Sequence, residues 1–285
     1  EYTTKDWDLL SPYCGLSFRK IQSKYMRFRL RLYVNKQVYG NVLPINYQYE
    51  QSAAIYKILS RSGEDYATWL HDNGFELQNG KRFKLFSYSP FKIEQRKVLT
   101  ESGRICILCN EIEWQVSFLP KKSTERFIQG VFSNQVFEIG DKLSRVQFQV
   151  KNIEMLPPLD YTDEMEFSAM SPVCLRKRRE DGSIEYMNLT DEMAKNAILS
   201  GLMSRYEAFY GKPYAESSSF DFDLLDMPKS SLVMIKAGTP DQTRVKGYKC
   251  RFRIKAPQPL MQIMYESGIG EECSQGFGCV RESRK

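Results

Sequence analysis

The regular pattern of the chain begins at residues 27–32, where hydrophobic and basic residues alternate one by one. Phe28, Leu30 and Leu32 occupy every second position, and arginines stand at 27, 29 and 31. A period of two is typical of a β-strand, because successive side chains of a strand point to opposite faces. The pattern predicts a strand with its hydrophobic face on a core and three arginines on the other face.

Helical spacing follows this strand. Residues 47–60 carry apolar side chains along one side, and residues 62–74 predict a second helix with Ser62 as its N-cap and Gly74 as its stop. The pattern then predicts a strand, a helix and a pair of strands, at 82–89, 123–132 and around 140–141. This order suits an α+β, ferredoxin-like domain, an antiparallel sheet with both helices on one face.

A second unit of the same kind follows a proline-containing stretch. Its elements are a strand, a hairpin return at Asp181-Gly182, a helix capped by Thr190, two strands and a short helix. Their expected ranges are 167–178, 184–187, 190–209, 231–237, 245–254 and 260–266. We therefore expect two tandem ferredoxin-like (RRM-like) domains: 26–156, a linker at 157–163, and 164–285, with residues 1–25 as an extension or cloning leader.

Composition narrows the class of protein. The 285 residues are 42% hydrophobic, contain no apolar run long enough to span a membrane, and open without a signal peptide. We therefore expect a soluble, cytoplasmic protein. Seven scattered cysteines and one histidine speak against a structural zinc site.

Positive charge is modest overall but clustered. The net charge of +6 is common among soluble proteins, whereas basic residues gather at 27–31, 176–179 and 244–255. Such strands are either solvated sheet faces or tracks for nucleic-acid phosphates, and the pattern alone leaves both readings open.

Near the C-terminus stand four glycines in eleven positions. Gly268-Ile269-Gly270 is followed, after five residues, by Gly276-Phe277-Gly278. Such spacing predicts a loop that bends through conformations that favour glycine, anchored by its two apolar residues. Bare N–H groups in this loop would form a nest for phosphate, although glycine-rich turns are also purely structural. The segment matches neither the dinucleotide fingerprint nor the nucleotide-triphosphate loop.

His71 is the only histidine of the chain. Histidine is the side chain whose ordinary pKa lies near neutrality, so His71 is the natural candidate for proton transfer. The alternative is a helix histidine that is merely hydrogen-bonded by a neighbour.

The paired glycine motif, with the segments 54–56, 69–71 and 84–89, resembles the CRISPR-associated endoribonucleases that process repeat RNA, members of the RAMP superfamily. The resemblance covers about residues 26–280. It implies that a helix tyrosine, a histidine near the end of the next helix and a lysine before a strand act together. The matching positions are Tyr56, His71 and Lys84, with Lys81 close enough to compete with Lys84.

The resemblance implies a metal-independent cleavage of pre-crRNA, in which the RNA 2′-OH attacks its adjacent phosphate and leaves 2′,3′-cyclic phosphate and 5′-OH ends. No cofactor or metal is expected. Partners would be CRISPR repeat RNA, with other effector subunits or a second copy of the chain left open. The implied RNA contacts come from the glycine loop and from basic residues of the second domain: Gly268, Gly270, Gly276, Gly278, Arg251, Arg253, Lys255, Arg176 and Arg178.

Two other classes of protein remain open. A non-catalytic RAMP subunit also carries a glycine loop and binds CRISPR RNA, although the helix histidine speaks against it. A metal-dependent nuclease would need a carboxylate cluster, for which the sequence offers Asp160, Asp163, Glu164 and Glu166. These acidic residues lie at the expected linker, where solvated side chains are common.

Overall fold

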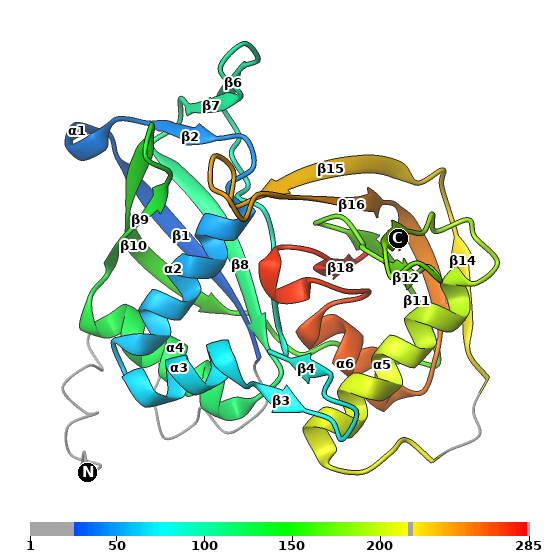
Figure 1. Cartoon of the computed structure of the whole chain (residues 1–285). Helices are drawn as coiled ribbons and strands as arrows, with labels where there is room; N and C mark the ends of the chain where they lie inside the picture. Colours follow the sequence, from blue (N-terminus) through cyan, green and yellow to red (C-terminus); the bar gives the residue numbers. More distant parts are fainter. Residues whose placement is uncertain (1–25, 216–218, 284–285) are drawn as a thin grey trace, which may run out of the picture.

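The computed structural model describes residues 26–215 and 219–283, so the predicted N-terminal extension lies outside the described part. The first half of the chain forms a five-stranded antiparallel sheet (Figure 1). Its strand order is β5-β8-β1-β10-β9. The strands are β1 (Arg27–Asn35), β5 (Phe86–Tyr88), β8 (Glu111–Phe118), β9 (Val136–Gly140) and β10 (Arg145–Met155).

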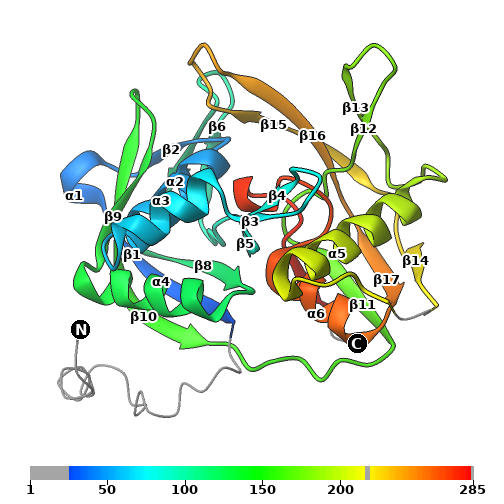
Figure 2. The ribbon, with the colours of Figure 1, turned by 60° about the horizontal axis from the view of Figure 1, so that its bottom comes forward.

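Helices α2 (Gln48–Ser60), α3 (Glu64–Asp72) and α4 (Lys121–Ser133) cover one face of this sheet (Figure 2). Phe28, Trp114 and Phe148 are among the fully buried side chains between the two layers. Gly130 lets α4 approach α2, because a Cβ at that position would lie 1.8 Å from the Ile58 carbonyl oxygen. The helix pair is therefore fixed by close backbone packing as well as by hydrophobic burial.

The second half forms a four-stranded antiparallel sheet of order β14-β17-β11-β18. When the core strands of each half are numbered by appearance, both sheets have the order 2-3-1-4, with β9 added at the edge of the first. The predicted pair of ferredoxin-like folds is thereby confirmed. The elements are β11 (Glu164–Ala169), α5 (Ala194–Tyr210), β14 (Asp221–Leu224), β17 (Arg251–Lys255), α6 (Gln258–Ser267) and β18 (Val280–Glu282).

Short elements decorate both units. Among them, the β15–β16 ribbon extends from the second half toward the first (Figure 1). The helical ones are α1 (Lys36–Tyr39) and the 3-10 turn η3 (Cys273–Gln275), and the strands are β2 (Val42–Pro44), β3 (Phe75–Glu76), β4 (Arg82–Phe83), β6 (Arg96–Leu99), β7 (Arg104–Ile107), β12 (Arg176–Arg178), β13 (Ile184–Tyr186), β15 (Lys229–Ile235) and β16 (Thr243–Lys249). Within the described residues, every helix is too short or too polar to cross a membrane.

Three predicted strands are divided in the structure. The strand expected at 82–89 splits into β4 and β5 around Leu85, whose φ is +54°. The cause is that Phe83 and Leu85 pack into the core of the second half, whereas Phe86 belongs to the first core. The strand expected at 245–254 breaks at Cys250, and that expected at 167–178 becomes β11 and β12.

Both predicted helix caps are wrong. Gly63 precedes α3, and the Ser62 hydroxyl donates to the carbonyls of Leu59 and Arg126 instead of capping the helix. The α5 helix begins only at Ala194, after one turn that contains Thr190 and a second turn at 191–194. In both places a tertiary or turn contact replaces the local cap that the sequence pattern indicated.

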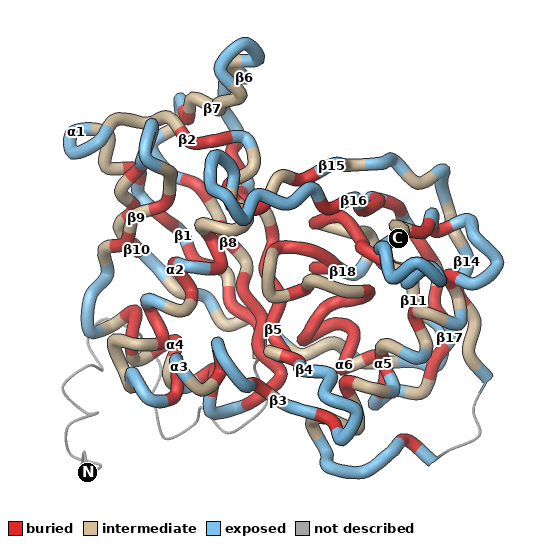
Figure 3. Tube along the Cα trace, viewed as in Figure 1, coloured by how far each residue is buried: buried red, intermediate tan, exposed pale blue. Residues whose placement is uncertain are grey.

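The two halves meet along a buried seam, visible as the central stretch of buried chain in Figure 3. Arg27 is only 2% exposed and donates to the carbonyl oxygens of Val280, at 2.6 Å, and Tyr265. Ser117 donates to the buried carboxylate of Glu266 at 2.7 Å. The prediction of an exposed basic face on β1 is therefore wrong for Arg27, which lies where the strand enters the seam.

Candidate active site

Tyr56, His71 and Lys84 come from α2, α3 and the short link between β4 and β5, and the structure brings them together. The rings of Tyr56 and His71 lie 5.0 Å apart between centroids, nearly perpendicular. The Lys84 Nζ donates to the backbone carbonyl of His71 at 2.5 Å. A phenol, an imidazole and an ammonium group thus share one small region of the surface.

The His71 ring is oriented by its neighbour in the helix. Its Nδ1 lies 2.8 Å from Oδ1 of Asp72, and the imidazole is 65% exposed. A carboxylate accepts a proton from Nδ1, which leaves the lone pair of the neutral ring on Nε2. The arrangement presents Nε2 as an acceptor for a proton from a bound molecule.

Tyr56 remains a proton donor at neutral pH. Its ring packs edge-on against Phe86, with the centroids 5.7 Å apart. Burial, and secondarily the charge of Asp72, raises the pKa of Tyr56 above its ordinary value. The phenol is therefore protonated over the whole physiological range, and its O–H can donate to an anion.

Lys84 reaches His71 because Gly74 leaves room for it. Gly74 ends α3 with φ at +63°, and a Cβ there would lie 2.5 Å from the Phe83 carbonyl oxygen and 3.0 Å from Lys84 Cδ. Burial and the charge of Arg82 lower the pKa of Lys84, and Asp72 raises it. Lys81 instead places its ammonium 5.4 Å from the Phe83 ring centroid.

The glycine loop, residues 268–278, lies between the two halves (Figure 1). All four glycines are buried and have positive φ, as the sequence predicted. A Cβ on Gly276 would lie 2.7 Å from Gln48 Cβ, on α2 of the other half. A Cβ on Gly278 would lie 1.9 Å from the Ile269 carbonyl oxygen. The loop needs glycine for close packing in the seam.

The expected nest of bare N–H groups is wrong for three of these glycines. The amides of Gly268, Gly276 and Gly278 donate to the carbonyls of Met264, Cys273 and Pro172. Amides that are already bonded inside the protein are poor ligands for phosphate. A role of the loop in RNA binding therefore has to act through its position or its side chains.

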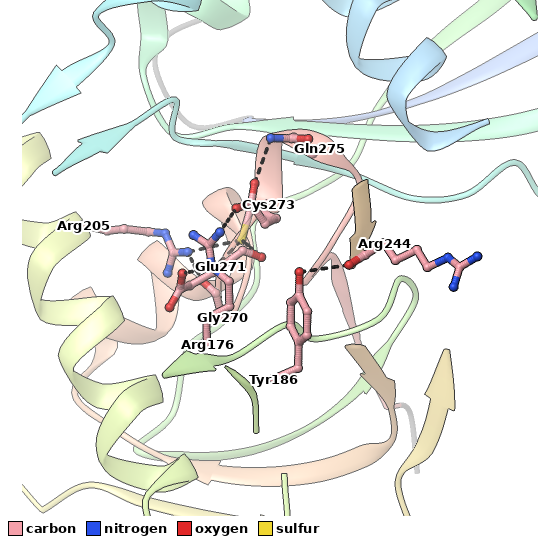
Figure 4. A network of polar contacts seen from close by, with 9 residues as sticks. Arg176, Tyr186, Arg205, Arg244, Gly270, Glu271, Cys273 and Gln275 are labelled. Atoms are coloured by element: carbon pink, nitrogen blue, oxygen red, sulfur yellow. Dashed lines mark hydrogen bonds and ion pairs between the residues drawn. The ribbon is translucent and has the colours of Figure 1, made fainter. Parts of the chain in front are cut away.

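Several predicted basic residues are ion-paired. Arg176 bonds both Glu271 and Glu272 at 2.6 Å and so ties β12 to the glycine loop (Figure 4). Arg253 pairs with Glu166 at 2.8 Å and with Glu164 at 3.6 Å.

The carboxylates considered for a metal nuclease thus include two partners of Arg253. In the described part of the chain, no group of three or more potential ligands is arranged to hold a metal ion. Arg251 lies 3.9 Å from Glu166, while Arg178 and Lys255 are exposed.

Two cavities flank the seam, and the sequence pattern indicated neither of them. One, of about 710 Å³, opens between the two sheets and is lined by Arg29, Arg251 and Arg281, among others. The other, of about 560 Å³, lies beside the glycine loop and contains Lys84 and Arg205 in its wall. Arg205 lay within a predicted helix, and nothing in its local sequence distinguished it from a solvated arginine.

Comparison with known proteins identifies relatives along nearly the whole chain. Residues 42–154 match the family described as CRISPR-associated protein Cas6, N-terminal, and residues 155–282 match its C-terminal counterpart. The CRISPR-associated endoribonuclease Cas6 1 of Methanocaldococcus jannaschii is 26% identical over 270 residues, covering 90% of this chain and 93% of that protein. The CRISPR-associated endoribonuclease Cas6 of Pyrococcus furiosus is 26% identical over 258 residues, covering 90% and 89%.

Solved structures show the same fold. The structure of a Cas6-related protein from Pyrococcus furiosus superimposes with a TM-score of 0.77 at 23% identity, covering 92% of this chain and 99% of that one. A RAMP protein described as binding different RNA substrates gives a TM-score of 0.75 at 22% identity, covering 91% and 100%. With both halves matched to its two family descriptions, and with the fold shared throughout, the chain belongs to the Cas6 family.

Proposed function

We propose that this chain is a metal-independent endoribonuclease that cleaves CRISPR repeat RNA within the pre-crRNA transcript. The observation that carries the proposal is the convergence of Tyr56, His71 and Lys84 from three separate elements. Support comes from the family membership and from relatives that are named endoribonucleases. The substrate is therefore argued from the family, and the mechanism from the site.

The geometry supports an internal transesterification. His71 Nε2 takes the proton of the 2′-OH, whose oxygen forms a bond to the adjacent phosphorus while the bond to the 5′ oxygen breaks. Tyr56 supplies the proton to the leaving oxygen, and the two side chains are reset by proton exchange with water. Lys84 offsets the negative charge that grows on the phosphate oxygens. The products are a 2′,3′-cyclic phosphate and a 5′-OH.

The nucleophile belongs to the substrate, so the protein has to orient the RNA backbone and needs no activated water. The cavity between the two sheets offers three arginines, Arg29, Arg251 and Arg281, for backbone phosphates. We assign to the glycine loop the role of holding the second half against α2, so that this basic surface keeps a fixed position relative to His71.

The test is a repeat RNA with one 2′-deoxy nucleotide immediately before the cut. We expect it to bind almost normally and to remain uncut, whereas the all-ribose RNA is cut in excess chelator and yields a cyclic phosphate. Binding would be measured by titration, and the ends of the products by mass spectrometry.

Other outcomes distinguish the alternatives. A cut in the deoxy RNA, or loss of activity in chelator, would show hydrolysis by activated water and overturn the roles of all three residues. Binding with no cleavage of any ribose RNA would identify a non-catalytic RNA-binding subunit.

A further inference from the structure

The cavity beside the glycine loop contains charge that the proposed cleavage does not use. Its wall is formed by the 81–86 segment, α5 and the glycine loop, so it lies directly next to Lys84 on the side of the second half.

Arg205 is a buried cation in this wall. It is 4% exposed, and its Nη2 donates to the Gly270 carbonyl and lies 3.2 Å from Cys273 Sγ (Figure 4). Its Nη1 has no hydrogen-bond partner among the described residues. No carboxylate of the described part forms an ion pair with Arg205, and a buried charge without a counter-ion is destabilising.

The other charges of the cavity do not compensate Arg205. Its two carboxylates, Glu271 and Glu272, are both bound to Arg176. Lys84, one of the further cations in the wall, donates its hydrogen bond to a neutral carbonyl. The cavity therefore presents a net positive charge that an anion would neutralise.

We propose that this cavity holds a second RNA phosphate, the one adjoining the cleaved phosphate, with Arg205 and Lys84 as its countercharge. The site rests on the proposed function, because it orients the same strand that His71 cleaves. Burial of the guanidinium keeps water from screening it, so one phosphate at this place fixes the register of the RNA.

Gly201 offers a way to occupy the site from within the protein. A Cβ on Gly201 would have only Arg205 Nη1 nearby, at 3.8 Å, and its φ is that of an ordinary helix. A carboxylate introduced there reaches Nη1 and takes the place of the phosphate. Gly201→Asp should therefore weaken RNA binding while leaving the fold at least as stable as in Gly201→Asn, which matches it in volume and lacks the charge.

The experiment measures affinity for the repeat RNA that wild-type chain cleaves, carrying one 2′-deoxy nucleotide before the cut. We expect Gly201→Asp to bind on the order of tenfold more weakly than Gly201→Asn, the loss typical of one charged contact. In a plot of log affinity against log salt concentration, the slope for Gly201→Asp should be smaller by about one unit. Met203→Asp adds the same charge at an exposed position of α5 outside the cavity, and should bind like wild type.

A scan with single methylphosphonates identifies the phosphate. In wild type, a neutral linkage next to the cut should weaken binding, and in Gly201→Asp the same change should cause no further loss. Equal affinity of folded Gly201→Asp and Gly201→Asn, or an equal penalty for that linkage in both backgrounds, overturns the second phosphate site while cleavage stands. Failure of wild type to cleave any repeat RNA overturns the proposed function and this site together.

Discussion

In the proposed mechanism, the imidazole of His71 alone removes the proton of the 2′-OH. His71→Ala should lower the single-turnover rate of repeat RNA cleavage by roughly 10²–10⁴-fold, the range typical of a lost general base. RNA affinity should stay within a few-fold, because the exposed ring lies outside the basic cavity proposed to bind the backbone phosphates. Rates would be measured with enzyme in excess over RNA. A variant that cuts at nearly the wild-type rate would move catalysis to another residue.

Lys84 and Lys81 form a matched pair for testing the cation. Lys84→Ala removes the ammonium that lies against His71, whereas Lys81→Ala removes one that lies over Phe83. We expect a loss of at least about 10²-fold in single-turnover rate for the first, in line with removal of a preorganised charge, and a change of a few-fold for the second. Equal losses in both variants would show that the local positive potential matters and not the contact with His71.

Single residues also mark where sequence reasoning reaches its limit. His71 was identifiable because it has no competitor, and Tyr56 because its spacing resembles a known motif. The sequence did not reveal which groups the charged side chains would contact. Arg27 and Arg253 looked alike in the sequence, yet one is buried in the seam and the other pairs with carboxylates of β11. These outcomes depend on which strands become neighbours, and a pattern along one strand does not contain that information.

At the scale of elements, the glycine loop shows that its backbone conformation depends on local sequence, whereas its packing partners depend on the tertiary fold. Its backbone conformation followed from glycine spacing, and the positive φ values confirm it. Its surroundings did not follow, because Gln48 and Tyr88, which confine Gly276, stand about 200 residues earlier. The strand predicted at 82–89 was wrong for the same reason, since alternate residues there serve two different cores.

Gly276 and Gly238 allow packing to be distinguished from backbone strain. Both have positive φ, at +93° and +73°, but only Gly276 has neighbours within 4 Å of an added Cβ. We expect Gly276→Ala to lower the free energy of unfolding by about 1–3 kcal/mol more than Gly238→Ala, the cost of overpacking a close contact. Chemical denaturation measures the difference. Similar losses in the two variants would mean that α2 and the loop move apart readily.

For the whole molecule, Glu266 in the seam makes stability depend on pH. Burial raises the pKa of Glu266, although Arg27 and Ser117 act in the opposite direction. A raised pKa in the folded state means that stability is fully present below the ordinary glutamate value and is lost as pH rises through the folded value. Glu266→Gln, which stays neutral, should therefore gain melting temperature relative to wild type between pH 4 and pH 7.

Glu94 provides the control for this measurement. Its side chain is 75% exposed, so Glu94→Gln should follow the wild-type melting temperature across the same pH range. A Glu266→Gln protein whose difference from wild type is constant between pH 4 and pH 7 would show that the carboxyl does not titrate in the seam. A difference that shrinks as pH rises would reverse the sign and show that the ionised carboxylate, in the field of Arg27, is stabilising.

The tandem arrangement could be predicted because each half repeats the order of strands and helices independently of its neighbour. The dividing point at residues 157–163 stays a prediction, and so do the roles of the site residues. Contacts across the seam could not be predicted from the sequence, because the alternation of polar and apolar positions indicates only that a face is buried. Which surface covers that face is decided by the meeting of two separate folds.

The position of the glycine loop near the C-terminus also determines when, during synthesis of the chain, the first half can complete its contacts. Ser52 on α2 donates to the carbonyl of Ser274, 222 residues further along the chain. At a synthesis rate of about 5–20 residues per second, the first half waits roughly 10–40 s for the segment that completes its contacts. During that interval the nascent chain carries His71 without the loop that we propose aligns the second half. The proposed cleavage site is therefore complete only after nearly all of residues 26–280 have left the ribosome.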